Sequence, residues 1–205
     1  MKNQKKQVYA FIDAANLFYG GEKNLGWKID YQKLLFYLKQ KYGVQTALYF
    51  GGIEIHDFPF DYQKQKSVPV KALIKYFTGH KMQRIEILHS LKTAKFYARL
   101  QLFGYLLYLK PVKTYYQQGG VIKKKANCDV DMTFHLMRLQ QEFDGVVILS
   151  GDGDFLPVLQ YLQNQEKEVV ILARSKRTAR ELKQFAQGNF SDFTRLRKQL
   201  EFYDK

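Results

Sequence analysis

The segment Ser150-Gly151-Asp152-Gly153-Asp154-Phe155 carries two carboxylates, and it directly follows the apolar run 146–149. Four apolar residues bounded by turn formers predict a short buried strand, and the two glycines permit an abrupt turn into a following helix. Two carboxylates this close repel each other, so a divalent cation between them and other acids is one explanation for their placement. Capping of the helix by Asp152 or Asp154 is the other explanation, and the segment alone favours neither.

Further acids follow other predicted elements. Asp13 ends a predicted strand at 8–12, Asn16 lies at a predicted helix start, and Asp129 begins another predicted helix. In a parallel sheet, acids that end two strands meet at the same carboxyl edge, where ligands bind in open α/β folds. Asp129 alone is explained by the helix dipole, which favours a carboxylate at this end. Acids converging from three segments are better explained by a metal.

The elements that position these residues alternate along the chain. Apolar runs predict strands at 8–12, 44–53, 105–109, 146–149 and 168–173, and helical periodicity predicts helices at 31–42, 70–77, 91–103, 129–143, from 154, at 178–186 and at 193–202. This alternation predicts an α/β fold with a mostly parallel, doubly wound sheet. We expect one domain over 1–205, with an insertion at about 54–89 and an irregular hairpin around Gly119-Gly120.

Composition narrows the class of partner. The 205 residues carry a net charge of +14, which points to a polyanion, nucleic acid first and an anionic membrane surface second. Exposed aromatic residues among the basic ones would suit stacking on unpaired bases. The single Cys128 excludes an intramolecular disulfide and a zinc site of several cysteines. No secretory leader or membrane span is visible, so we expect a cytoplasmic protein without a membrane partner.

Several motifs in this order resemble the NYN domain family, in its LabA-like branch within the wider PIN-like nuclease group. The resemblance rests on Phe11 to Leu17, on Gly104-Tyr105 followed by Lys110 to Lys113, on Lys125 with Asp129 to Asp131, and on Asp144 through Phe155. It covers most of the chain apart from 54–89.

The resemblance implies a compact Rossmann-like fold, with helices on both faces of the sheet and an acidic pocket for Mg²⁺ or Mn²⁺. It implies metal-dependent cleavage of RNA. The residues that match the family's metal-binding and catalytic positions are Asp13, Asp129, Asp152 and Asp154. Asn16 and Ser150 match polar positions beside the pocket that contact phosphate or orient a ligand, and Lys125 matches a contact to the scissile phosphate.

One position departs from the family pattern. Family members often carry a further acid along the helix that Asp129 begins, and His135 stands there instead. His135 lies four residues after Asp131 on the same helix face, so the two can simply pair, or His135 can bind Mn²⁺. The substitution puts catalytic competence in question and favours a structural role for His135.

Other functions fit the residues less well. An aspartyl phosphatase usually has an acid at the position of Ala15, and a serine hydrolase elbow has Gly at the position of Ile148. A phosphate-binding NTPase has a Gly-rich loop with Lys and Ser or Thr, and none follows the first strand. The serious alternative is a non-catalytic nucleic-acid-binding or regulatory protein that retains the fold. The retained acids weigh against it, since they repel phosphate unless a metal intervenes. The apolar faces leave a homodimer open without identifying one.

Overall fold

Buried apolar strands form the centre of the protein. The computed structural model describes residues 6–17, 26–79, 85–116 and 122–203. Its six-stranded sheet has the order β3-β2-β1-β6-β7-β8, and a separate two-stranded ribbon pairs β4 with β5. The strands are β1 (Val8–Asp13), β2 (Val44–Ile53), β3 (Leu106–Pro111), β4 (Lys113–Tyr116), β5 (Ile122–Lys125), β6 (Gly145–Leu149), β7 (Glu168–Ala173) and β8 (Phe190–Asp192).

Parallel pairing brings two predicted site segments to one edge of this sheet. The pairs β1–β6, β6–β7 and β7–β8 are parallel, and Ile12 lies opposite Leu149. Every residue of β6 is buried, which is why this strand is a continuous apolar run. Asp13 and Ser150 therefore leave the sheet side by side at its carboxyl edge. The predicted α/β, Rossmann-like sheet is confirmed.

Helices connect the strands of the sheet. They are α1 (Ala14–Leu17), α3 (Tyr31–Tyr42), α4 (Val70–Gly79), α5 (Ile85–Phe103), α6 (Asp129–Arg138), α7 (Leu156–Asn164), α8 (Arg180–Ala186) and α9 (Arg197–Leu200). The bounds of α3 follow from its caps. The Asp30 side chain accepts from the N–H groups of Gln32 and Lys33, and Gly43 ends the helix with φ 68°, a conformation glycine adopts without strain. None of the described helices is long and apolar enough to cross a bilayer.

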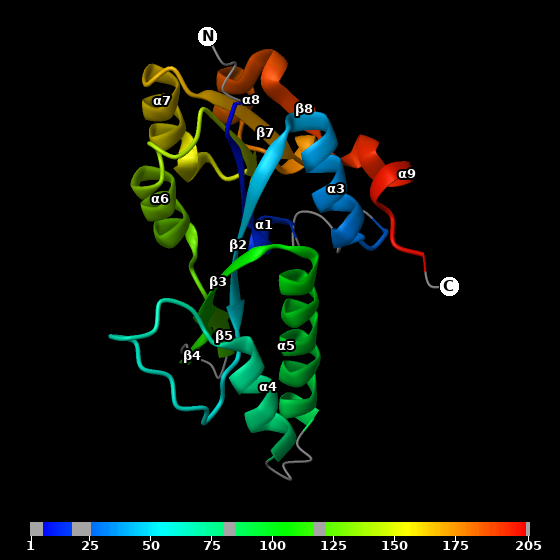
Figure 1. The fold of residues 1–205 in the computed structure, drawn as a ribbon, viewed down its shortest axis with the longest axis vertical. Coiled ribbons are helices and arrows are strands. Elements are labelled where there is room, and N and C mark those ends of the chain that lie inside the picture. Colours follow the sequence, from blue (N-terminus) through cyan, green and yellow to red (C-terminus); the bar gives the residue numbers. More distant parts are fainter. Residues whose placement is uncertain (1–5, 18–25, 80–84, 117–121, 204–205) are drawn as a thin grey trace. The chain divides into compact units, whose positions relative to one another are not determined.

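The chain forms two compact units. The first comprises 1–48 and 129–205, and the second comprises 49–128, so β2 contributes residues to both. Within the first unit, α6 and α7 lie on one side of the strands and α3 lies on the other (Figure 1). Within the second unit, α4 and α5 pack side by side (Figure 1). The segment predicted as an insertion, 54–89, falls inside the second unit.

Several predicted bounds were wrong. The helix expected over 129–143 ends at Arg138, although Leu139 and Phe143 beyond it are buried. The helix expected over 193–202 is a 3-10 helix over Phe193–Leu196 followed by the short α9. Strand β8 was not expected at all, because three residues give no readable periodicity. The predicted turn at Gly119-Gly120 lies outside the described residues.

Candidate functional site

Asp13 is a buried carboxylate at the end of β1. Its residue is 5% exposed, and its Oδ1 accepts hydrogen bonds from the N–H groups of Ala15 at 2.9 Å and Asn16 at 3.1 Å. These bonds cap the first turn of α1 and fix the direction in which the carboxylate points. Its Oδ2 accepts a hydrogen bond from the Ser150 hydroxyl at 3.2 Å. The carboxylate is therefore held by both α1 and the segment that follows β6.

Ser150 and Asn16 hold the segment after β6 against β1. The Ser150 hydroxyl, which donates to Asp13, also accepts from the N–H of Asp152 at 3.2 Å. The Asn16 side chain accepts from the N–H of Gly151 at 3.1 Å. Both side chains are thus engaged in positioning this turn. Their predicted role as ligand contacts stays a prediction.

The two acids after β6 are placed differently from each other. Asp152 is half-buried and caps the 3-10 helix Gly153–Phe155, where its Oδ1 accepts from the N–H of Asp154 at 3.0 Å. Asp154 is exposed. The capping role that the sequence left open is therefore present at Asp152. It occupies one carboxylate oxygen and leaves the other to be coordinated or solvated.

Asp129 is close enough to Asp13 to affect its ionisation. The pKa of Asp13 is raised to about 6, chiefly because burial destabilises the charged form and also because the Asp129 carboxylate repels it. Hydrogen bonds from Asn16, Ser150 and Ala15 oppose the increase in pKa. Asp129 itself lies half-buried in the first turn of α6, where the helix dipole favours negative charge. A carboxylate from a different element thus lies near enough to Asp13 to disfavour its ionised form.

The described residues limit the kind of metal site that these acids can form. Among them, no three His, Cys, Asp or Glu side chains converge closely enough to form an all-protein metal cage. Two carboxylates with oxygen neighbours fit a different type of site. Mg²⁺ is commonly held by one or two carboxylates and completes its shell with waters and substrate phosphates. Buried Asp13 and half-buried Asp129, whose charges repel each other, fit that type of site.

His135 lies on the buried side of α6. It is buried, and its Nδ1 donates to the backbone carbonyl of Asp131 at 2.8 Å. The ring also packs edge-on against Phe134, with centroids 5.3 Å apart. These contacts fit the structural role that the sequence favoured. The bond goes to the backbone of Asp131, whereas the sequence suggested pairing between the two side chains.

The segment 150–155, which we call the acidic turn, packs closely against residues that the sequence did not point to. The N–H of Ala179 donates to the carbonyl of Gly151 at 3.0 Å. A Cβ on Gly151 would lie 2.9 Å from Oγ1 and 3.0 Å from Cα of Thr178. Gly151 is therefore required for the close approach of this segment, and the partners are almost thirty residues away in sequence. Lys125, the other predicted site residue, lies exposed on β5 in the second unit.

A shallow hollow of about 610 Å³ lies at the opposite end of the first unit's strands. It is lined by Lys6, Asp144, Gln163, Glu166, Lys167 and Glu168, near the amino ends of β6 and β7. Ligands of parallel α/β sheets bind at the carboxyl ends of the strands. We therefore place the candidate site at Asp13 and not in this hollow.

Sequence comparisons with known proteins agree with the motifs. The NYN domain family model matches residues 7–201. The Low amplitude and bright protein LabA of Synechococcus elongatus is 23% identical over 98% of this chain and 91% of its own length. A Vibrio parahaemolyticus protein of unknown function shares the fold, with a TM-score of 0.64 and 20% identity over 94% of this chain and 95% of that chain. A mutant of the T5 5'-exonuclease gives a TM-score of 0.44 and 16% identity over 88% of this chain and 56% of that chain.

Proposed function

Because this chain belongs to the NYN domain family, we propose that it is a divalent-metal-dependent ribonuclease that cleaves single-stranded RNA. The observation that carries the proposal is the buried carboxylate of Asp13 at the carboxyl edge of the sheet, whose pKa is raised by burial and by the Asp129 carboxylate. A carboxylate with a pKa raised to about 6 by burial and repulsion is poorly stabilised as an anion. A cation at this position would offset both costs.

The residues present fit Mg²⁺ or Mn²⁺. Asp13 and Asp129 would supply hard oxygen ligands, and Asp152 would bind the metal or its waters through the oxygen that is not used in capping. Asp154, which is exposed on the same turn, would bind outer waters. When bound, such an ion neutralises phosphate charge, activates water and stabilises the leaving oxygen.

The remaining residues of the site act by positioning. Ser150 fixes Oδ2 of Asp13, and Asn16 fixes the turn that carries Asp152 through its bond to Gly151. One of the carboxylates orients or deprotonates the attacking water. Lys125 would contact a substrate phosphate. The net charge of +14 attracts the polyanionic substrate and makes binding dependent on salt.

A second candidate function follows from one specific observation. The described residues bring together two carboxylates and no group of three metal ligands. A nucleic-acid-binding or regulatory protein that retains the fold without cleavage would have no need of a complete metal cage. This candidate does not explain why a buried carboxylate, Asp13, lies within the electrostatic influence of a second acid, so it ranks second.

Cleavage of end-labelled single-stranded RNA tests the proposal. The protein is incubated with Mg²⁺ or Mn²⁺, with EDTA in a parallel sample, and with single-stranded DNA of the same sequence as a competing substrate. We expect shortened RNA only in the samples that contain metal. RNA that is bound but uncleaved under every metal condition would instead support the second candidate.

A further inference from the structure

The positive charge of the protein is concentrated in the second unit. Residues 49–128 contain 14 Lys and Arg against 4 Asp and Glu, a net charge of +10. The other 125 residues contain 19 Lys and Arg against 15 Asp and Glu, a net charge of +4. A basic surface on one part of a protein is the electrostatic footprint of polyanion binding. The second unit is therefore the part of the chain that attracts a polyanion most strongly.

The ribbon of β4 and β5 places like charges opposite each other. Lys113 pairs with Lys125 in the antiparallel register, and Thr114 pairs with Lys124. Like charges directly opposite on a ribbon destabilise it, and a two-stranded ribbon has little stability to spare. The pair Lys113 and Lys125 therefore does not serve the stability of the ribbon, and a polyanionic ligand would offset its repulsion.

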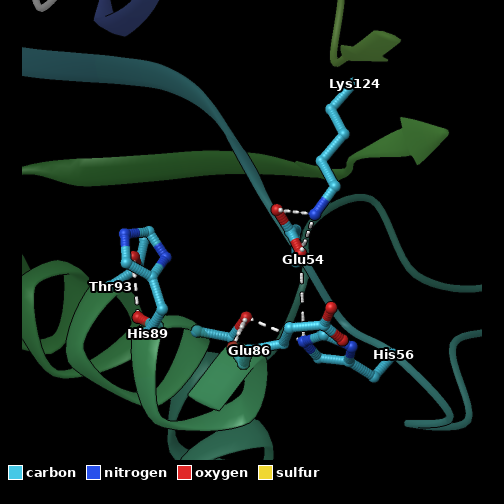
Figure 2. Close-up of polar contacts among 7 residues, drawn as sticks. Glu54, His56, Glu86, His89, Thr93 and Lys124 are labelled. Carbon is cyan, nitrogen blue, oxygen red and sulfur yellow. Dashed lines mark hydrogen bonds and ion pairs between the residues drawn. The ribbon is translucent and has the colours of Figure 1, made fainter. Parts of the chain in front are cut away.

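Neighbouring lysines of β5 differ in their partners. Lys124 lies 3.0 Å from both carboxylate oxygens of Glu54, and Glu54 lies 3.9 Å from Nε2 of His56. His56 in turn bonds to the Ser90 hydroxyl of α5 at 2.8 Å. Figure 2 shows Lys124 reaching Glu54 and Glu54 lying beside His56. The charge of Lys124 is thus used inside the unit, tying the ribbon to α5.

Lys113 and Lys125 are available to a ligand. Both are exposed, and neither makes an ion pair with a carboxylate among the described residues. Tyr115 lies two residues after Lys113, so it shares a face of the strand with it, and its residue is 50% exposed. A flat aromatic ring beside cations is an arrangement that stacks an unpaired base while holding the neighbouring phosphates.

We propose that Lys113, Tyr115 and Lys125 form a binding surface for single-stranded nucleic acid on the β4–β5 ribbon, with a base on Tyr115 and phosphates on the two lysines. The proposal deepens the proposed function, from which it takes the phosphate contact of Lys125 and the expectation that the strand is RNA, and it adds Lys113 and Tyr115. It assigns the ribbon to holding substrate and the carboxylates of the first unit to chemistry.

Fluorescence anisotropy with a labelled single-stranded RNA in EDTA tests the surface without any cleavage. We expect Tyr115→Ala to weaken binding roughly 5- to 150-fold, and Tyr115→Phe, which keeps the ring, to bind like the wild type. We expect the double variant Lys113→Gln/Lys125→Gln to weaken binding. It should also lower the slope of log affinity against log salt by about 1.4, because two phosphate contacts are lost.

Matched variants separate the surface from net charge. Lys39→Gln/Lys41→Gln removes the same charge from exposed positions of α3 in the first unit, and we expect it to bind RNA with the wild-type salt slope. Lys124→Gln removes the lysine that Glu54 already neutralises, and we expect it to bind more tightly than Lys125→Gln. An equal loss in the ribbon and α3 double variants would overturn the proposal, because net charge alone would then explain binding.

One substitution should separate binding from stability. Lys113→Glu turns the like-charge pair with Lys125 into an opposite-charge pair, so the melting temperature should hold or rise while RNA affinity falls. Loss of both together would overturn the proposal by showing a structural role. If Lys113→Glu lost binding to phosphatidylserine vesicles but kept its RNA affinity, the ribbon would be a membrane-binding surface, and the proposal would be overturned. The binding assay contains EDTA, so its result does not depend on cleavage. Binding through this surface, together with no cleavage in the separate assay with metal, would support the surface and contradict the proposed function.

Discussion

The Ser150 hydroxyl donates a hydrogen bond of 3.2 Å to Oδ2 of Asp13, and it joins the ends of two adjacent parallel strands. Both residues are buried, so this bond is protected from water. The same hydroxyl accepts from the N–H of Asp152, which extends the link into the acidic turn. One serine thus orients a carboxylate and the backbone of a second acidic residue.

Removal of this hydroxyl should change the ionisation of Asp13 as well as stability. The hydrogen bond from Ser150 lowers the pKa of Asp13, so Ser150→Ala should raise that pKa further above its ordinary value. Mn²⁺ binding needs the ionised carboxylate, so the pH midpoint of Mn²⁺ affinity should move upwards. Isothermal titration across a pH series measures that midpoint. An unmoved midpoint, even with a loss of about 1–3 kcal/mol in stability, would show that Ser150 is only structural.

The raised pKa of Asp13 gives the metal-free protein a defined pH dependence. The folded state binds the Asp13 proton more tightly than the unfolded state, so this group's contribution to stability is present below its ordinary pKa of 3.8 and lost as pH rises through about 6. Asp13→Asn lacks this titration. Between about pH 4 and pH 7, the free energy of unfolding of the wild type in EDTA should fall relative to the variant by roughly 2.4 kcal/mol. Urea unfolding at each pH gives both curves, and parallel curves would contradict the assignment.

Mn²⁺ binding should offset the loss of stability that the ionised Asp13 carboxylate causes. At a free Mn²⁺ concentration about a hundred times its dissociation constant, the wild type should gain about 2.7 kcal/mol in unfolding free energy. Asp13→Asn and Asp129→Asn should lose most of this gain, because each removes a ligand from the two-carboxylate site. Thermal unfolding with and without Mn²⁺ measures it. Asp144→Asn is the control, since Asp144 precedes the opposite end of β6, where its carboxylate accepts a hydrogen bond from the N–H of Gln7. An equal Mn²⁺ gain in all four proteins would place the metal elsewhere.

The two glycines of the acidic turn should differ in their tolerance of alanine. A Cβ on Gly151 would meet the backbone of Thr178, whereas a Cβ on Gly153 would chiefly meet the mobile end of the Glu181 side chain. Gly151→Ala should therefore cost about 1–3 kcal/mol by forcing a shift, and Gly153→Ala less than about 1 kcal/mol. Chemical denaturation of the two variants tests this. Equal costs would show that the contact with Thr178 does not constrain the turn.

Much of the fold could be predicted because its elements have clear limits in the sequence. The bounds of α3 are fixed by the cap Asp30 and by Gly43, and β2 and β7 are apolar runs whose predicted limits match the structure. Short elements could not be predicted, since the three residues of β8 pair through a sheet that only the folded chain brings together. Helix α6 stops at Arg138 while buried apolar residues continue beyond it, so periodicity alone extends it too far.

Part of the candidate site could also be predicted from local sequence patterns. Strand ends follow from local patterns, and parallel pairing then brings Asp13 and Ser150 together. The contact of Gly151 with Thr178 and Ala179 depends on tertiary packing that no local pattern records. The separation of charge between the two units was also hidden, because the limits of the units follow from contacts and not from composition.

Cleavage of single-stranded RNA by Asp13→Asn tests the central claim most directly. The variant keeps an oxygen that can accept from Ala15 and Asn16, so it should fold, while it loses the negative charge that would hold the metal. In Mn²⁺, we expect the wild type and the control Asp144→Asn to cleave at similar rates and Asp13→Asn to show no cleavage above the EDTA background. Wild-type cleavage by a folded Asp13→Asn would contradict the assignment of the nuclease site to the carboxyl edge of β1.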